Sequence, residues 1–166
     1  SAEETFEFWD KNYTIKRMIR MVRAYKPDII IPTFLDVNGQ HGHHRSVTRA
    51  TIEAYDKSND PEMFPDDNFG PWKISQIFLP AWSGGGGSYD DEEDPPKATH
   101  SIDVGNFNHI YGGTYNQIGE WSRSYHATQN IGKLAYEDKM DVPLHLLKGT
   151  YVDGDITGGL IPKNFN

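Results

Sequence analysis

Residues 26–45 read KPDIIIPTFLDVNGQHGHHR, and this stretch decides the expected fold. Pro27 disfavours helical backbone in the residue before it, so a helix should end at Lys26. The β-branched run Ile29–Ile31 is typical of a short, buried parallel strand. A polar loop follows the strand and leads directly into the histidine-rich segment 41–44.

Helical periodicity flanks this strand on both sides. From Asn12 to Lys26, and again from Ser46 to Tyr55, apolar residues recur at spacings of three and four, which predicts amphipathic helices. Helix, strand, loop and helix form one step of a doubly wound sheet. We therefore expect an α/β fold with a Rossmann-like sheet and flanking helices. The loop after Ile31 then lies at the edge where such sheets bind ligands.

The rest of the chain shows weaker patterns. Residues 83–96 contain four consecutive glycines and five consecutive acids, and we expect a mobile, solvated surface insertion. Four further segments have strand patterns and one has a helix pattern. The strands are Trp72–Leu79, Ile102–Gly105, Leu144–Leu147 and Gly149–Val152, and the helix is Tyr115–Leu134.

Composition restricts the classes of function. The chain has 166 residues, 36% of them hydrophobic and 13% aromatic, which predicts a globular protein. Its net charge of −8 gives no electrostatic support for nucleic-acid binding. The absence of cysteine excludes disulfides and thiolate metal sites, so any metal must bind His, Asp or Glu.

Nothing in the sequence predicts a membrane span, since no apolar stretch approaches the ~20 residues that a spanning helix needs. The acidic start SAEETFEF lacks the features of a signal peptide. The sequence predicts a soluble protein. It does not determine the compartment, although a periplasmic or extracellular location is favoured over a cytoplasmic one. Because it begins with Ser1 close to a helix, we expect a fragment of a longer protein.

Three of the seven histidines fall within four positions, at His41, His43 and His44. Neutral imidazole is a common zinc ligand, and a catalytic zinc usually has three protein ligands and one open position. At the first turn of a helix His41 and His44, three apart, can face the same side while His43 points elsewhere. Asp36 is a candidate carboxylate partner. The alternative is a solvated loop with incidental histidines, or with adventitious metal binding.

Residues 26–45 resemble a signature of the PIG-L/LmbE family of zinc-dependent N-deacetylases, in which a strand leads to a loop bearing His-x-x-His at the start of a helix. Gly42 and His43 stand where Pro-Asp is usual, a variation associated with a bacterial subgroup. Residues 123–129 (RSYHATQ) are similar to the family's later His-x-Ser-Gln element, with Thr128 in place of Ser.

The resemblance implies a role for each matched residue. His44 is a zinc ligand, with another divalent metal as the alternative, and His41 is a catalytic group beside the scissile carbonyl. Five residues are expected around this pair, as outer-sphere or packing groups. They are His43, Arg45, Asp36, His126 and Gln129. The implied reaction is metal-assisted hydrolysis of an N-acyl group on an amino sugar or glycoconjugate, and the expected acyl group is N-acetyl.

One family element is missing, namely Ala-His-Pro-Asp-Asp-Glu, which supplies the other ligands and the general base. The nearest string, residues 64–68 (FPDDN), begins with Phe64, which cannot bind zinc. We therefore expect residues 1–136 to be the C-terminal part of a deacetylase domain, residues 137–166 to be an extension of unknown role, and the missing N-terminal part to be its partner. The alternative is a non-catalytic carbohydrate-binding or interaction module.

Overall fold

The computed structural model describes residues 1–65, 68–82, 93–126, 128 and 140–160. It divides into two compact units, Ser1–His100 with Leu144–Asn166, and Ser101–Pro143. Helices and a mixed sheet are both present, which confirms the expected α/β class at that level. No helix among the described residues is long and apolar enough to cross a membrane.

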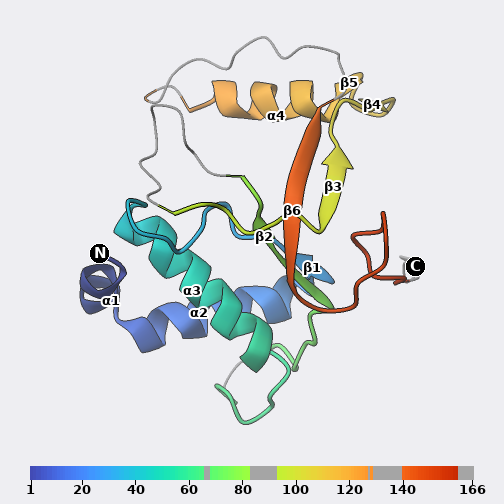
Figure 1. Cartoon of the computed structure of the whole chain (residues 1–166). Helices are drawn as coiled ribbons and strands as arrows, with labels where there is room; N and C mark the ends of the chain where they lie inside the picture. Colours follow the sequence, from blue (N-terminus) through green and yellow to red (C-terminus); the bar gives the residue numbers. More distant parts are fainter. Residues whose placement is uncertain (66–67, 83–92, 127, 129–139, 161–166) are drawn as a thin grey trace. The chain divides into compact units, whose positions relative to one another are not determined.

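Three helices lie together on one side of β1 and β2 in the first unit (Figure 1). They are α1 (Ala2–Trp9), α2 (Lys11–Tyr25) and α3 (Gly42–Lys57). The boundaries of α2 follow from its caps. Asp10 accepts a hydrogen bond from the Tyr13 amide, and Lys26 takes a left-handed conformation before Pro27. The predicted end of this helix is confirmed.

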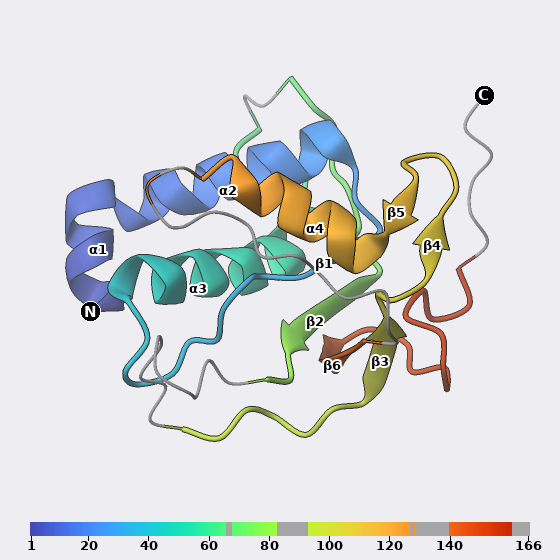
Figure 2. The same cartoon turned by 90° about the horizontal axis from the view of Figure 1, so that it is seen from above.

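The core forms where α2 packs on α3 (Figure 2). The apolar face of α2 presents Ile15, Ile19 and Val22 to Ala50 and Ala54 of α3, and Ile74 joins them. Full burial of an aliphatic side chain of this size stabilises the fold by about 1.5–3 kcal/mol. The short alanines let the two helices approach closely.

The main sheet has four strands in the order β1-β2-β6-β3. These are β1 (Ile29–Ile30), β2 (Gln76–Pro80), β6 (Asp141–Lys148) and β3 (His100–Asp103). β1 and β2 are parallel, as expected, whereas β2 and β6 are antiparallel. The segment expected to be a C-terminal extension, residues 137–166, therefore contains the whole of β6.

The second unit contains a two-stranded antiparallel sheet of β4 (Phe107–Asn108) and β5 (Gly113–Thr114). Helix α4 (Tyr115–Ser124) follows directly and begins with a capping box between Thr114 and Gln117.

Several predicted boundaries are wrong. Ile31 is 44% exposed and lies outside β1, so the strand is shorter and less buried than expected. β2 begins at Gln76, because Trp72 is held in a loop by its indole hydrogen bond to the Pro27 carbonyl, at 2.7 Å. Residues 149–152 are not a strand, since Gly149 turns the chain with a φ of 133°.

Two further predictions extend beyond the described residues. The helix predicted to reach Leu134 ends at Ser124, and residues 129–134 are not described. Residues 83–92 of the expected insertion are likewise outside the described part. Glu93, in the described part of the same segment, accepts a hydrogen bond from the Asn38 amide at 3.3 Å.

Candidate functional site

The histidine segment lies where the loop after β1 enters α3. His41 is the N-cap residue of α3 and has extended backbone, with φ −60° and ψ 140°. The His41 side chain makes no capping hydrogen bond to the start of the helix. His43 and His44 lie in the first helical turn, so the backbone of α3 sets the directions of their side chains.

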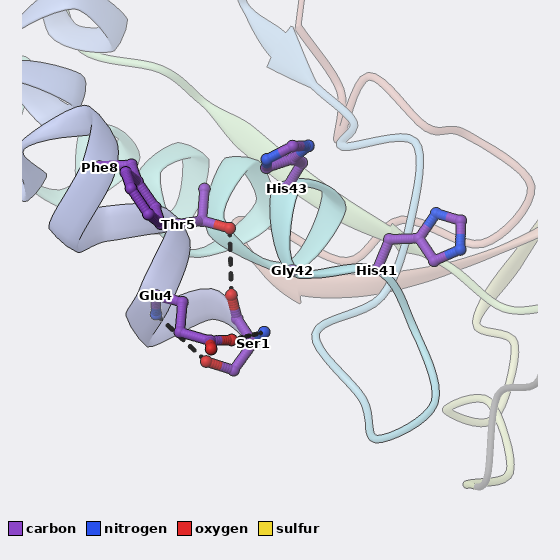
Figure 3. Close-up of a pocket in the computed structure, with 7 residues that line it drawn as sticks. All are labelled: Ser1, Glu4, Thr5, Phe8, His41, Gly42 and His43. Atoms are coloured by element: carbon purple, nitrogen blue, oxygen red, sulfur yellow. Dashed lines mark hydrogen bonds and ion pairs between the residues drawn. The ribbon is translucent and has the colours of Figure 1, made fainter.

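The structure brings His41 and His44 together and turns His43 away. The ring centroids of His41 and His44 are 5.2 Å apart, with an interplanar angle of 32°. His43 instead stacks on Trp9 of α1 at 4.8 Å. Figure 3 shows His41 and His43 leaving the start of α3 in different directions. The chemical roles of the pair remain predictions.

Two residues without a predicted role hold His44. The side-chain oxygen of the buried Gln40 lies 2.8 Å from Nδ1 of His44 and also accepts a hydrogen bond from the His41 amide at 3.0 Å. The ring of Phe34 stacks on His44 at 3.9 Å, nearly parallel at 7°. Burial, followed by the charges of His41 and His43, lowers the pKa of His44 and favours its neutral form.

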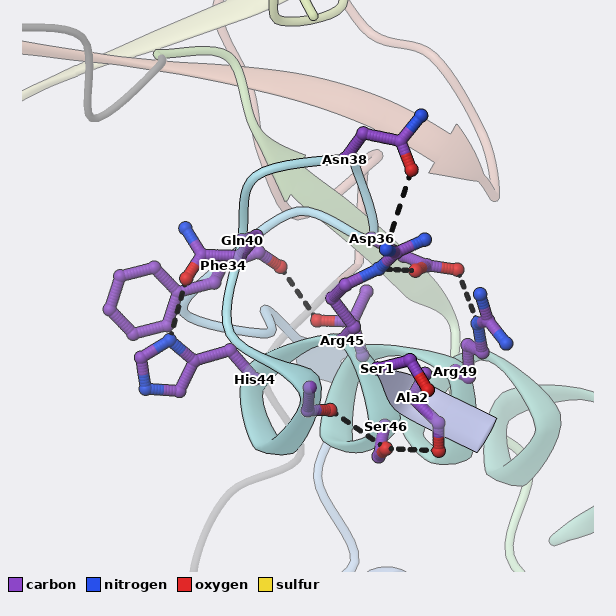
Figure 4. Close-up of polar contacts among 12 residues, drawn as sticks. Ser1, Ala2, Phe34, Asp36, Asn38, Gln40, His44, Arg45, Ser46 and Arg49 are labelled. Atoms are coloured by element: carbon purple, nitrogen blue, oxygen red, sulfur yellow. Dashed lines mark hydrogen bonds and ion pairs between the residues drawn. The ribbon is translucent and has the colours of Figure 1, made fainter. Parts of the chain in front are cut away.

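Asp36 anchors the loop to α3 (Figure 4). Its two carboxylate oxygens accept hydrogen bonds from Nε of Arg45 at 2.7 Å and Nε of Arg49 at 2.5 Å. Burial alone would raise the pKa of Asp36, but the two arginines outweigh it and lower the pKa. Asp36, the carboxylate expected near a metal, thus binds guanidinium groups with both of its oxygens. Arg45, which was also expected near the site, supplies one of these groups.

Gly42 allows α1 to approach the start of α3. A Cβ atom at this position would collide with the backbone carbonyl of Ser1. Ser46, one turn further along α3, donates to the carbonyl of Ala2 at 3.1 Å or of Gly42 at 2.8 Å. A shallow hollow of about 490 Å³ lies beside this junction, lined by α1 residues and by His41, Gly42 and His43. The departure from Pro-Asp at positions 42–43 therefore has a packing reason.

The later expected element, residues 123–129, belongs to the second unit. His126 is exposed, belongs to the second unit and lies beyond the end of α4. Its expected role as an outer-sphere or packing group stays a prediction. Gln129 lies outside the described residues.

The sequence pattern predicts no role for Phe34, Gln40 or Arg49. Gln40 directly precedes His41 in the sequence, and this position could have predicted a contact with the histidines. The sequence gives no such indication for Phe34 and Arg49. Phe34 meets His44, and Arg49 meets Asp36, only because the loop after β1 folds back against α3.

The described residues do not form a complete metal site. Across the part of the chain that the structure describes, no group of three or more His, Asp or Glu residues could hold a metal ion. Zinc usually takes four ligands, three of them from protein in a catalytic site. The pair His41 and His44 fits zinc in the chemistry of its nitrogen donors but not in their number.

Part of the chain is similar to a known protein. No protein-family model matches the chain. Over 80 residues, which is 46% of this chain, it is 29% identical to the 1D-myo-inositol 2-acetamido-2-deoxy-alpha-D-glucopyranoside deacetylase 1 of Frankia alni. The match spans only 27% of that relative's length. The chain is therefore similar in part to a protein named as a deacetylase.

Proposed function

We propose that this chain contributes part of the active site of a metal-dependent N-deacetylase with a Rossmann-like sheet. The observation that carries the proposal is the side-by-side placement of the His41 and His44 rings at the start of α3. A loop joins this helix to β1, a strand with a parallel neighbour. The partial similarity to a named deacetylase supports the same reaction class.

In this proposal His44 is a metal ligand and His41 is the polar group beside the scissile carbonyl. The lowered pKa of His44 supports its role, because only a neutral imidazole has a lone pair to donate. A bound zinc ion would lower the pKa of a water molecule to roughly 7 and polarise the carbonyl. His41 would donate a hydrogen bond to the developing oxyanion or aid the leaving amine.

We further propose that a segment with the family's Ala-His-Pro-Asp-Asp-Glu pattern completes the site. Residues 1–166 contain no such pattern, and the described residues supply too few metal donors. The missing groups are the remaining ligands and the general base. The substrate class we propose is an N-acetylated amino sugar conjugate, which rests on the wording of the relative's name.

The experiment compares the 166-residue chain with the full-length gene product. Deacetylation of N-acetylglucosaminyl conjugates is measured together with bound zinc. We expect the shorter chain to show no turnover and only weak zinc binding. Full activity from the 166 residues alone would overturn the proposal that the site is incomplete.

Substitutions in the full-length product then test the two roles. His44→Ala should abolish both activity and stoichiometric zinc. His41→Ala should lower kcat by about 10²–10³ and leave zinc bound, as removal of one oxyanion donor does in other enzymes. His109→Ala, in the second unit, is the matched control and should change neither. Unchanged hydrolysis in His44→Ala would show that any metal on this residue is adventitious.

The second candidate is a non-catalytic carbohydrate-binding module. It is favoured by one observation in the second unit, where the Trp121 ring lies against Gly113 and remains 51% exposed. An indole supported on one face and exposed elsewhere suits stacking on a sugar ring. Glycan binding that is lost in Trp121→Ala, without turnover in the full-length product, would favour this candidate.

A further inference from the structure

One amide oxygen in the site contacts two nitrogen atoms. Oε1 of Gln40 accepts the backbone N–H of His41 at 3.0 Å and lies 2.8 Å from Nδ1 of His44. Gln40 is only 7% exposed, and His44 is partly buried. Figure 4 shows the Gln40 side chain turned toward the His44 ring.

The backbone fixes which end of the Gln40 amide faces these nitrogens. A main-chain N–H can only donate, so the atom opposite the His41 amide must be the amide oxygen. The reversed orientation would place an NH2 group against an N–H group. The backbone N–H of His41 therefore fixes the orientation of the Gln40 amide.

This orientation determines the tautomer of the neutral His44 ring. An amide oxygen can only accept, so the nitrogen 2.8 Å away must carry the proton. In a neutral imidazole a protonated Nδ1 leaves the lone pair on Nε2. The parallel stack of Phe34 at 3.9 Å restricts rotation of the ring out of this plane.

We propose that Gln40 is a positioning residue that holds His44 as the Nδ1–H tautomer and so presents Nε2 as the donor atom. The use of that donor for a metal rests on the proposed function, whereas the tautomer itself does not. Hydrogen bonds from the second ring nitrogen commonly orient metal-ligating histidines and increase their basicity.

The test is the tautomer of each histidine, read by long-range ¹H–¹⁵N NMR on the full chain labelled with ¹⁵N-histidine, at a pH where the rings are neutral. The chain contains two internal references. Nδ1 of His145 lies 2.8 Å from the Lys97 carbonyl, and Nε2 of His100 lies 3.1 Å from the Val152 carbonyl. Because a carbonyl only accepts, His145 should show the Nδ1–H pattern and His100 the Nε2–H pattern.

His44 should show the Nδ1–H pattern of His145. Gln40→Leu removes the acceptor and should convert His44 to a tautomer mixture or to Nε2–H, with both references unchanged. Gln40→Glu keeps an acceptor at the same place and should retain the Nδ1–H pattern. An Nε2–H pattern for His44 in the unsubstituted protein would overturn the inference, even if Gln40→Leu fails to fold.

Zinc titration of the full-length product separates this inference from the proposed function. Gln40→Leu should weaken zinc binding by about 10–100-fold, the usual effect of losing such a partner, and Gln40→Glu should restore it. If the tautomers behave as expected and zinc does not bind, the positioning role stands and the deacetylase proposal fails. If zinc binds equally well in all three proteins, Gln40 does not position a ligand.

Discussion

Arg49 joins Asp36 of the histidine loop to Glu3 of α1. Its Nε lies 2.5 Å from Oδ2 of Asp36, and its Nη1 lies 2.6 Å from a carboxylate oxygen of Glu3. Arg45 holds the other oxygen of Asp36 at 2.7 Å. The partly buried carboxylate of Asp36 therefore fixes the loop to α3. Arg49 also binds Glu3 and so connects α1 to the loop and to α3.

Asp36→Asn should loosen this junction. The amide keeps one acceptor oxygen but loses its charge and its second acceptor, so we expect the free energy of unfolding to fall by roughly 1–2 kcal/mol. Urea denaturation measures this change. Glu7→Gln on the exposed side of α1 is the matched control and should have almost no effect. Equal stabilities of the two variants would contradict an anchoring role for Asp36.

Acid should weaken the same junction. The hydrogen bond to Arg49 is the main cause that lowers the pKa of Glu3 from 4.5 to about 2, and the pKa of Asp36 is also lowered. A carboxyl with a lowered folded pKa stabilises the fold above its unfolded pKa, and this contribution is lost as the pH falls through the folded pKa. Stability should therefore decline between about pH 4.5 and about pH 2.

Arg49→Leu removes the strongest of the interactions that lower the pKa values of Glu3 and Asp36, so it should flatten this decline. Urea midpoints measured for both proteins from about pH 6 to about pH 2 check the expectation. The same steepness in the variant would show that other carboxyls dominate acid unfolding.

Gly149→Ala should be strongly destabilising. Gly149 has a φ of 133°, and a Cβ there would collide with the side-chain oxygen of Gln76. That oxygen also accepts the Thr150 amide at 2.7 Å, while the Gln76 amide donates to the Thr150 carbonyl at 2.8 Å. Strain and overpacking together should cost about 3 kcal/mol or more.

Gly154→Ala provides the control for backbone strain alone. Gly154 has a φ of 70°, but no atom lies within 4 Å of a Cβ built there. Its cost should be about 1–2 kcal/mol, the usual penalty for a left-handed residue with a side chain. Thermal or urea unfolding that gives equal losses for the two variants would rule out the contact with Gln76 as the cause.

Gly42→Ala should separate α1 from the start of α3. Alanine favours helix by about 0.5–1 kcal/mol, but its Cβ would meet the Ser1 carbonyl, so we expect a net loss of about 1–3 kcal/mol. Hydrogen exchange of the α1 amides should become faster. Gly119→Ala in α4 meets nothing within 4 Å and should be stabilising. Stabilisation by both substitutions would contradict the close approach of α1.

The sequence by itself determined the local elements of this protein. The spacing of Ile15, Ile19 and Val22 predicts α2, and Pro27 predicts its end, because both effects act between residues within one helical turn. The spacing of His41 and His44 in a single turn likewise predicts that their rings can meet. None of these inferences needs distant parts of the chain.

Only the tertiary structure decided the partners of these elements. The start of β2 depends on its pairing with β1, and the turn after β6 depends on Gln76, which bonds Thr150 across 74 positions. Asp36 became an anchor, and Gln40 a partner of His44, because the loop folds back on α3 and places them there. Helical periodicity is set by neighbouring residues, whereas the partner of a polar side chain is set by which distant segments meet, and local sequence does not encode that.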